Sequence, residues 1–161
     1  MSVATFNQTR PKDSFTGHVD VLIVGAGISG LGMGHYLATT LPGKSFALLD
    51  GRDAIGGTWD LFRYPGIRSD SDLHTFGYEF KPWTSDNAIA DAHEILDYLH
   101  EVIEEDDLGR RIYLQHKIVK ADFSSETARW TVTVERDGQQ WEVTCAFLFG
   151  ATGYYDYASG Y

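Results

Sequence analysis

The residues of this chain that best fit a chemical role are three closely spaced glycines and one acid. Gly25, Gly27 and Gly30 follow the apolar run at residues 19–24, and Asp50 comes 20 positions after the last of them. Glycines at this spacing allow a tight turn, a close approach of the backbone to a pyrophosphate, and close packing of the following helix. A carboxylate at the position of Asp50 can accept hydrogen bonds from ribose hydroxyls. Together these residues predict a dinucleotide-binding βαβ unit.

Two strands and the helix between them must position these residues. An apolar run such as Val19, Val21, Leu22, Ile23 and Val24 is typical of a strand buried on both faces of a parallel sheet. Residues 28–41 are expected to form the helix, with glycines on the face that packs on the sheet. The second strand is expected at residues 45–50 and ends in Asp50. Taken alone, Asp50 fits equally well as an ordinary acid at a strand end.

A long glycine-rich and aromatic segment follows where a standard unit would begin its next helix. In Gly56-Gly57-Thr58-Trp59 the paired glycines allow close backbone approach to a ligand, and the tryptophan offers a flat apolar wall. The alternative is a surface loop with a core tryptophan. Residues 71–84 give no clear pattern. A helix is expected from residue 85 or 86 to residue 105, and its acidic residues are expected to form a solvated face.

Three antiparallel strands are expected between residues 113 and 145, with a tight hairpin at Asp137-Gly138. Cys145 is expected to be a core residue and not a nucleophile. Residues 146–150 are again continuously apolar, which predicts a buried parallel strand that ends in Ala151-Thr152-Gly153. Small residues there let a cofactor come near, because ligands lie beyond the carboxyl ends of parallel strands. The expected fold class is α/β, a Rossmann-like βαβ fold with a parallel sheet and a three-stranded antiparallel β-meander.

Composition limits the other possibilities. The 161 residues are 43% hydrophobic, which fits one globular domain, and the net charge of −10 argues against nucleic acid as a partner. The longest stretch that contains neither a charged residue nor histidine, residues 21–34, is too short to span a bilayer. The single cysteine excludes an intramolecular disulfide and a cysteine zinc cluster, and no metal site is expected. Residues 1–17 lack the apolar core of a signal peptide, so we expect a flexible leader and a cytoplasmic protein.

The larger pattern resembles a known family. Between residues 18 and 161 the chain is similar to the N-terminal part of the flavin-dependent monooxygenases of the Baeyer–Villiger type. It is most similar to the ethionamide-activator branch, which acts on ketones and thio compounds. The resemblance rests on stretches at residues 25–30, 56–60, 63–70, 80–83 and 151–155, which read GAGISG, GGTWD, RYPGIRSD, FKPW and ATGYY.

The resemblance implies FAD as the cofactor and NADPH as the reductant of the full-length enzyme. O2 and a small-molecule ketone or thio compound would be the other reactants, and oxygen transfer would proceed through a C4a-peroxyflavin. It also assigns roles to individual residues. The pyrophosphate would be held by Gly25, Gly27 and Gly30, with Ile28 and Ser29 opening the helix. The adenosine end would be contacted by Asp50 at the ribose, by Arg52 near the phosphates and by the backbone of Ile118 at the adenine. The route toward the isoalloxazine would be lined by Gly57, Thr58 and Trp59, with Thr152 and Gly153 at the last strand end. Asp70 would lie beside the flavin, where the nicotinamide arrives, as the candidate catalytic residue.

The chain departs from the family in two ways. Asp50 stands where the family usually has glutamate. The chain also ends at Tyr161 without a second GxGxxG, the family's downstream fingerprint or the active-site arginine. We therefore expect residues 18–161 to be the N-terminal portion of a Rossmann-like FAD-binding domain, with the NADPH-binding domain absent and the C-terminal part as a partner. Alone, it is expected to be inactive and to bind FAD weakly or not at all.

Two other classes remain open at this point. One is a stand-alone dinucleotide-binding module with a regulatory role. The other is an NAD-dependent oxidoreductase domain or a methyltransferase domain. The loop at residues 56–59 and the meander before Ala151 argue against the second class.

Overall fold

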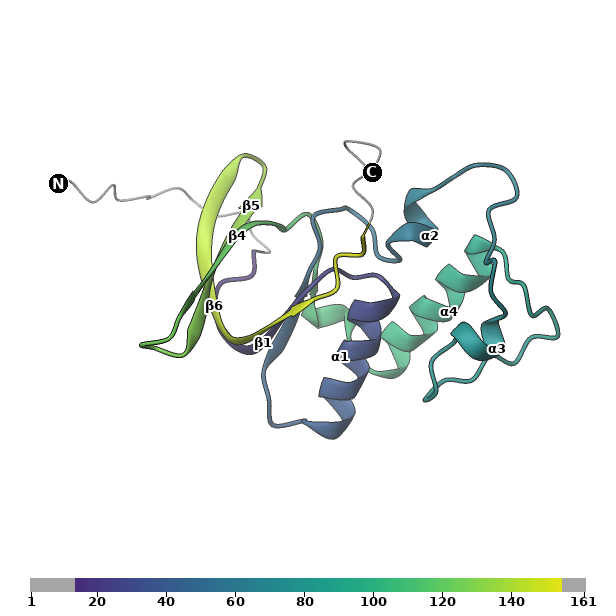
Figure 1. Ribbon diagram of the computed structural model, residues 1–161, viewed down its shortest axis with the longest axis horizontal. Coiled ribbons are helices and arrows are strands. Elements are labelled where there is room, and N and C mark those ends of the chain that lie inside the picture. Colours follow the sequence, from purple (N-terminus) through teal and green to yellow (C-terminus); the bar gives the residue numbers. More distant parts are fainter. Residues whose placement is uncertain (1–13, 155–161) are drawn as a thin grey trace.

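The computed structural model describes residues 14–154, which fold around one six-stranded sheet of order β3-β2-β1-β6-β5-β4 (Figure 1). The sheet is mixed, because β1, β2, β3 and the end of β6 run parallel whereas β4, β5 and the start of β6 run antiparallel. The strands are β1 (Gly17–Val24), β2 (Phe46–Leu49), β3 (Ile112–Tyr113), β4 (Lys117–Ser124), β5 (Arg129–Arg136) and β6 (Gln139–Gly150). The α/β class, the parallel sheet and the three-stranded meander are thus confirmed.

Helix α1 (Ile28–Thr40) joins β1 to β2, as the sequence predicts. The expected close packing is most severe at Gly30, where an added Cβ would lie 2.0 Å from the carbonyl oxygen of Gly25. At Gly34 the same atom would lie 3.3 Å from Leu108. Any larger residue at position 30 would therefore push the helix away from the loop that it follows.

Strand β6 is longer than expected. The sequence suggested a return strand and then a separate parallel strand, but residues 139–150 form one continuous strand. It pairs antiparallel with β5 as far as Cys145 and parallel with β1 from Val143 to Gly150. Beyond Cys145 only one edge of β6 is paired with a described strand, and α1 packs over β1 and β2. The expected burial of residues 146–150 is therefore wrong: Phe147 is 69% exposed, Phe149 is 37% exposed, and Ala146 and Leu148 are only half-buried.

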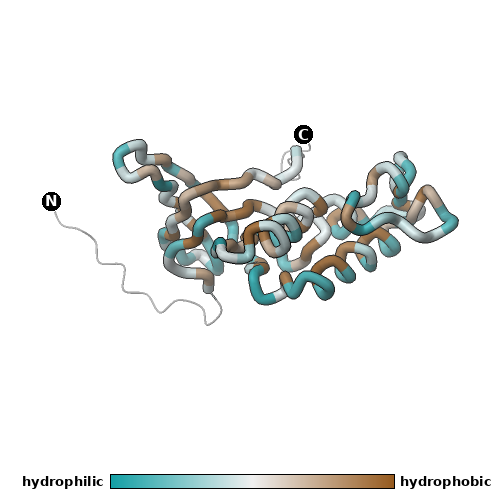
Figure 2. Tube along the Cα trace, turned by 90° about the horizontal axis from the view of Figure 1, so that it is seen from below, coloured by the Kyte–Doolittle hydropathy of each residue, from teal (hydrophilic) through white to brown (hydrophobic). Residues whose placement is uncertain are grey.

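The segment between β2 and β3 contains α2 (Thr58–Leu61), α3 (Leu73–Phe76), α4 (Ala92–Glu105) and the 3-10 turn η1 (Gly109–Arg111). Helix α4 begins several residues later than expected. Asp91 and Glu94 form a capping box, in which the Glu94 carboxylate accepts the amide of Asp91 at 2.9 Å. The preceding residues are not helical, since the carbonyl of Ala90 accepts the amide of Ser69 at 2.9 Å. The amphipathic character of α4 is confirmed, with hydrophobic residues along its inner side (Figure 2).

The sheet carries one hydrophobic core on each face. Helices α1 and α4 cover one face, and that core includes Ile23, Leu31, Leu48, Ile95, Leu99 and Leu108. The meander covers the other face, and that core includes Leu22, Leu49, Val132, Val134, Val143 and Cys145. Figure 1 shows the meander and the helices on opposite sides of β1. The two cores fix the carboxyl ends of β1, β2 and β6 relative to one another.

The expected leader of residues 1–17 is only partly among the described residues. Phe15 is buried, its amide donates to Nε2 of His116 at 3.2 Å, and its carbonyl accepts Nε1 of Trp141 at 2.8 Å. Gly17 is already the first residue of β1. The segment from residue 14 onward therefore packs on the domain, because Phe15 fills the core under the meander. Tyr155, which belongs to the stretch ATGYY, lies outside the described residues.

Candidate dinucleotide-binding site

A cavity of about 500 Å³ lies at the carboxyl ends of β1, β2 and β6. The structure brings twelve of the predicted site residues to its wall: Gly25, Gly27, Ile28, Ser29, Asp50, Arg52, Gly57, Thr58, Trp59, Ile118, Thr152 and Gly153. Two others do not line it. Gly30 is buried against Gly25, as described above, and Asp70 is exposed on the segment before α3.

The first wall of the cavity is the loop after β1. Gly25 has a φ of +112°, and a Cβ there would lie 2.3 Å from the carbonyl oxygen of Ala151. Its amide donates to Leu49 at 2.8 Å, and the amide of Ala151 donates to Val24 at 2.8 Å. The ends of β1, β2 and β6 are therefore joined through backbone hydrogen bonds at the position where only glycine fits.

The amino terminus of α1 opens into this cavity. Gly27 is its N-cap residue in an extended conformation, and the first turn contains neither a side-chain cap nor an acidic residue. Ile28 and Ser29, the first residues of the helix, both line the cavity. Because the first amides of a helix have no intrahelical acceptor and carry the positive end of its dipole, they favour an anion.

Asp50 holds the loop next to this helix end. One carboxylate oxygen accepts the amide of Ala26 at 2.8 Å and the other accepts the amide of Arg52 at 2.9 Å. Its own amide donates to Tyr113 at 3.0 Å, and its carbonyl accepts the amide of His116 at 2.7 Å. The acid is thus fixed at the cavity wall, and each carboxylate oxygen retains a lone pair for a further donor.

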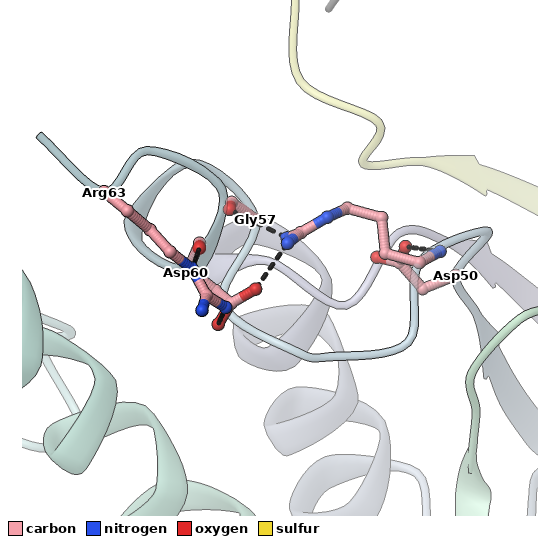
Figure 3. A network of polar contacts seen from close by, with 5 residues as sticks. Asp50, Gly57, Asp60 and Arg63 are labelled. Atoms are coloured by element: carbon pink, nitrogen blue, oxygen red, sulfur yellow. Dashed lines mark hydrogen bonds and ion pairs between the residues drawn. The ribbon is translucent and has the colours of Figure 1, made fainter.

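Arg52 is bound within the protein. Its Nη1 donates to the carbonyl of Gly57 at 3.1 Å, and its Nη2 forms an ion pair with Asp60 (Figure 3). Asp60 also accepts Nη2 of Arg63 at 3.2 Å. The guanidinium of Arg52 therefore joins the Gly57 carbonyl to Asp60 and stabilises the turn at Gly57. The Cα of Gly57 lies 3.7 Å from the place of an added Cβ at Gly27.

Trp59 forms the apolar part of the wall. It packs edge-on against Phe76, with ring centroids 6.0 Å apart. Asp70 is not near this group in the cavity lining, and its carboxylate accepts the hydroxyl of Ser71 at 3.5 Å. The candidate catalytic acid is therefore not part of the cavity wall.

Among the wall residues that sequence reasoning did not assign to the site are two with titratable side chains, His116 and Lys117. Both precede Ile118 at the beginning of β4, so the one signal available was their position beside a residue already assigned to the site. His116 is 1% exposed, its Nδ1 lies 2.7 Å from the carbonyl oxygen of Leu114, and its Nε2 accepts the amide of Phe15. Burial lowers the pKa of its ring below the ordinary value of 6.5.

The remaining chemical candidates do not form a site within residues 14–154. Cys145 is fully buried, which confirms its core assignment, and burial raises the pKa of its thiol to about 11. No group of three or more metal-ligating side chains occurs in this part of the chain. None of its helices is long and apolar enough to cross a membrane.

Fold and site define a Rossmann-like dinucleotide-binding domain, and comparison with known proteins agrees. Residues 23–88 match the family model described as an NAD(P)-binding Rossmann-like domain. The chain is 50% identical over 146 residues to the FAD-containing monooxygenase EthA of Mycolicibacterium smegmatis, covering 91% of this chain and 30% of that protein. It is 47% identical over 145 residues to the probable FAD-binding monooxygenase AlmA of Acinetobacter baylyi, and this match covers 89% of this chain and 29% of that protein.

Solved structures give the same result. An oxidized steroid monooxygenase bound to NADP aligns with a TM-score of 0.76 and 34% identity, over 84% of this chain and 26% of that one. A closed crystal structure of cyclohexanone monooxygenase aligns with a TM-score of 0.76 and 29% identity, over 86% of this chain and 26% of that one. By sequence and fold, the chain is therefore similar to part of the flavin-dependent monooxygenases. It spans about 30% of the length of the curated relatives it matches.

Proposed function

We propose that this chain binds the ADP half of FAD, as the FAD-binding portion of a flavin-dependent monooxygenase. The observation that carries the proposal is the uncapped amino terminus of α1, which opens into a cavity whose wall also holds Asp50. An anionic pyrophosphate fits the helix end, and a ribose fits the acid. Relatives named as FAD-containing monooxygenases support FAD over other dinucleotides.

Different residues of the cavity wall bind different parts of the ligand. Gly27, which has no side chain, lets the phosphates approach the amides of Ile28 and Ser29. Asp50 accepts a ribose hydroxyl with its remaining lone pairs, and the backbone of Ile118 lies at the adenine end. Arg52 acts on the phosphates indirectly, by holding the Gly57 turn.

The other end of the cavity would receive the flavin. Trp59 and Thr58 line the route toward the isoalloxazine, and Thr152 and Gly153 let it lie close to the end of β6. When bound and reduced by NADPH, FAD would supply the chemistry that transfers oxygen from O2 to a ketone or thio compound. Asp70 would act in the complete enzyme near the nicotinamide. A cytoplasmic location is part of the proposal, supported by the unpaired thiol of Cys145.

Calorimetric titration of the purified chain with FAD, ADP, FMN and NAD tests the proposal. We expect FAD and ADP to bind with similar, weak affinity, because both carry the adenosine and the pyrophosphate. FMN, which lacks both, should not bind. Tighter binding of NAD than of FAD would instead support an NAD-dependent oxidoreductase domain, and binding of none of the four would contradict the proposal. We expect no oxidation of NADPH by this chain with FAD.

A further inference from the structure

A tyrosine outside the cavity reaches the helix that opens into it. Tyr78 lies between α3 and α4, and its hydroxyl donates a hydrogen bond to the carbonyl of Ile28, the first residue of α1. Tyr78 does not line the cavity, whereas Ile28 and Ser29 do. Burial raises the pKa of the hydroxyl above its ordinary value of 10, so the group stays neutral and can donate.

Gly32, one turn further along α1, makes this contact possible. A Cβ at Gly32 would lie 2.8 Å from Cε1 of Tyr78, so the ring occupies the space that any other residue would fill. The hydroxyl of Tyr78 therefore reaches the carbonyl of Ile28, to which the amide of Gly32 donates in a regular helix.

The tyrosine is held in place from its other side by α4. The amide of Tyr78 donates to the hydroxyl of Tyr98 at 2.8 Å, and that hydroxyl donates to the carbonyl of Lys81 at 2.6 Å. Lys81 forms ion pairs with Glu101 and Glu105 at 3.0 and 2.7 Å. The Tyr78 ring therefore has little freedom to leave α1.

The carbonyl of Ile28 and the amide of Ser29 belong to the same planar peptide unit. A hydrogen bond that fixes this carbonyl therefore also fixes the direction of the Ser29 N–H. The same bond polarises the peptide, because hydrogen bonds in a chain strengthen one another. The Ser29 amide is one of the uncapped donors at the amino terminus of α1.

We propose that Tyr78 is a positioning residue for the pyrophosphate site, because it aims the Ser29 amide into the cavity through the carbonyl of Ile28. This inference rests on the proposed binding of the ADP half of FAD. It gives the segment between α3 and α4 a role in cofactor binding, although this segment does not touch the cavity. Glycine inside a helix is usually unfavourable, and at the buried position 32 it is explained by the docking of Tyr78.

Tyr78→Phe tests the inference by removing only the hydroxyl. The phenylalanine ring still fills the space over Gly32, so the thermal unfolding midpoint of the free protein should change little. The dissociation constants of ADP and FAD should rise roughly fivefold, because the Ser29 amide is no longer held toward the phosphates and its hydrogen bond weakens. Tyr36→Phe is the matched control, since Tyr36 is on the same helix but lies beyond its first turns. Its affinities should equal those of the unaltered chain.

Adenosine separates positioning from a general structural effect, because it lacks the phosphates. Its binding, followed by saturation-transfer NMR, should be the same in Tyr78→Phe and the unaltered chain. Equal losses for adenosine and ADP, or an unchanged ADP affinity in Tyr78→Phe, would overturn the inference alone. Failure of the unaltered chain to bind either ADP or FAD would overturn the proposed function, and the inference with it.

Gly32→Ala provides a second variant that displaces the same ring. Its Cβ would collide with Tyr78, and we expect a rise in the ADP dissociation constant similar to that of Tyr78→Phe. The double variant should show about the same rise as either single one, because both act through one contact. Gly43→Ala, where an added Cβ meets nothing within 4 Å, is the control. Additive effects in the double variant would contradict the mechanism.

Discussion

The carboxylate of Asp50 accepts the backbone amide of Ala26 at 2.8 Å, which ties the end of β2 to the glycine loop after β1. The second carboxylate oxygen accepts the amide of Arg52 at 2.9 Å. The acid that a dinucleotide-binding unit offers to a ribose is therefore also a structural clamp in this protein. The shorter aspartate side chain, in place of the family's usual glutamate, reaches both amides.

Replacing Asp50 should affect both folding and binding. Asp50→Ala leaves the amides of Ala26 and Arg52 without their acceptors, so we expect the free energy of unfolding to fall by about 1–3 kcal/mol. ADP binding should weaken more than this loss of folded protein explains. Denaturant unfolding and calorimetric titration measure the two effects separately. Asp53→Ala, which removes the same charge from an exposed position of the same loop, should change neither; equal behaviour of the two variants would contradict the clamp.

The three fingerprint glycines should respond differently to alanine. At Gly25 and Gly30 an added Cβ would lie 2.3 and 2.0 Å from backbone oxygens, so both variants should be destabilised by about 1–3 kcal/mol or more. At Gly27 the atom nearest to an added Cβ would be 3.7 Å away, so Gly27→Ala should lower the free energy of unfolding by less than about 1 kcal/mol. The Gly27→Ala methyl group would instead stand between the helix amides and the phosphates. Thermal unfolding should therefore show the smallest loss of stability for Gly27→Ala, and ADP titration of the folded proteins should show the largest loss of affinity for the same variant. A folded Gly27→Ala protein with full ADP affinity would contradict the proposed phosphate position.

The two arginines that share Asp60 provide a matched pair. The Arg52 side chain is 27% exposed and holds both Asp60 and the Gly57 carbonyl, whereas Arg63 is 78% exposed. Arg63→Ala should change stability by less than about 0.5 kcal/mol, as is usual for a solvated ion pair. Arg52→Ala should cost about 1 kcal/mol, because the Gly57 carbonyl also loses its donor, and should weaken ADP binding. Denaturant titration measures the stability of the two variants, and calorimetry measures their ADP affinity. A larger loss of stability in Arg63→Ala than in Arg52→Ala would contradict the structural role given to Arg52.

The site was largely predictable because its signals are local. The strand ends, the glycine spacing and the acid at position 50 each depend on neighbours in the sequence. The contact between Tyr78 and Ile28 was not predictable, since it joins residues 50 positions apart and depends on Gly32, which falls outside the fingerprint. The start of α4 could have been found, because Asp91 and Glu94 have the spacing of a capping box. The exposure of Phe147 could not, because it depends on where β5 ends its pairing with β6.

His116 should make the stability of the domain depend on pH. Its neutral ring accepts the amide of Phe15 at Nε2, and a proton on Nε2 would set two donors against each other. Burial and the nearby positive charge of Arg136 lower its folded pKa below 6.5, so the unfolded chain binds more protons in that range. The stabilisation is therefore complete above about pH 6.5 and is lost as the pH falls through the folded pKa.

Unfolding free energies of the unaltered chain and of His116→Gln, measured between pH 5 and 8, test this dependence. Glutamine can still accept the Phe15 amide but does not titrate, so the difference between the two proteins should shrink as the pH falls below about 6.5. The exposed His93 supplies the control, because His93→Gln should leave the slope unchanged. A constant difference between the unaltered chain and His116→Gln across this range would mean that His116 is not held neutral by its burial against Phe15.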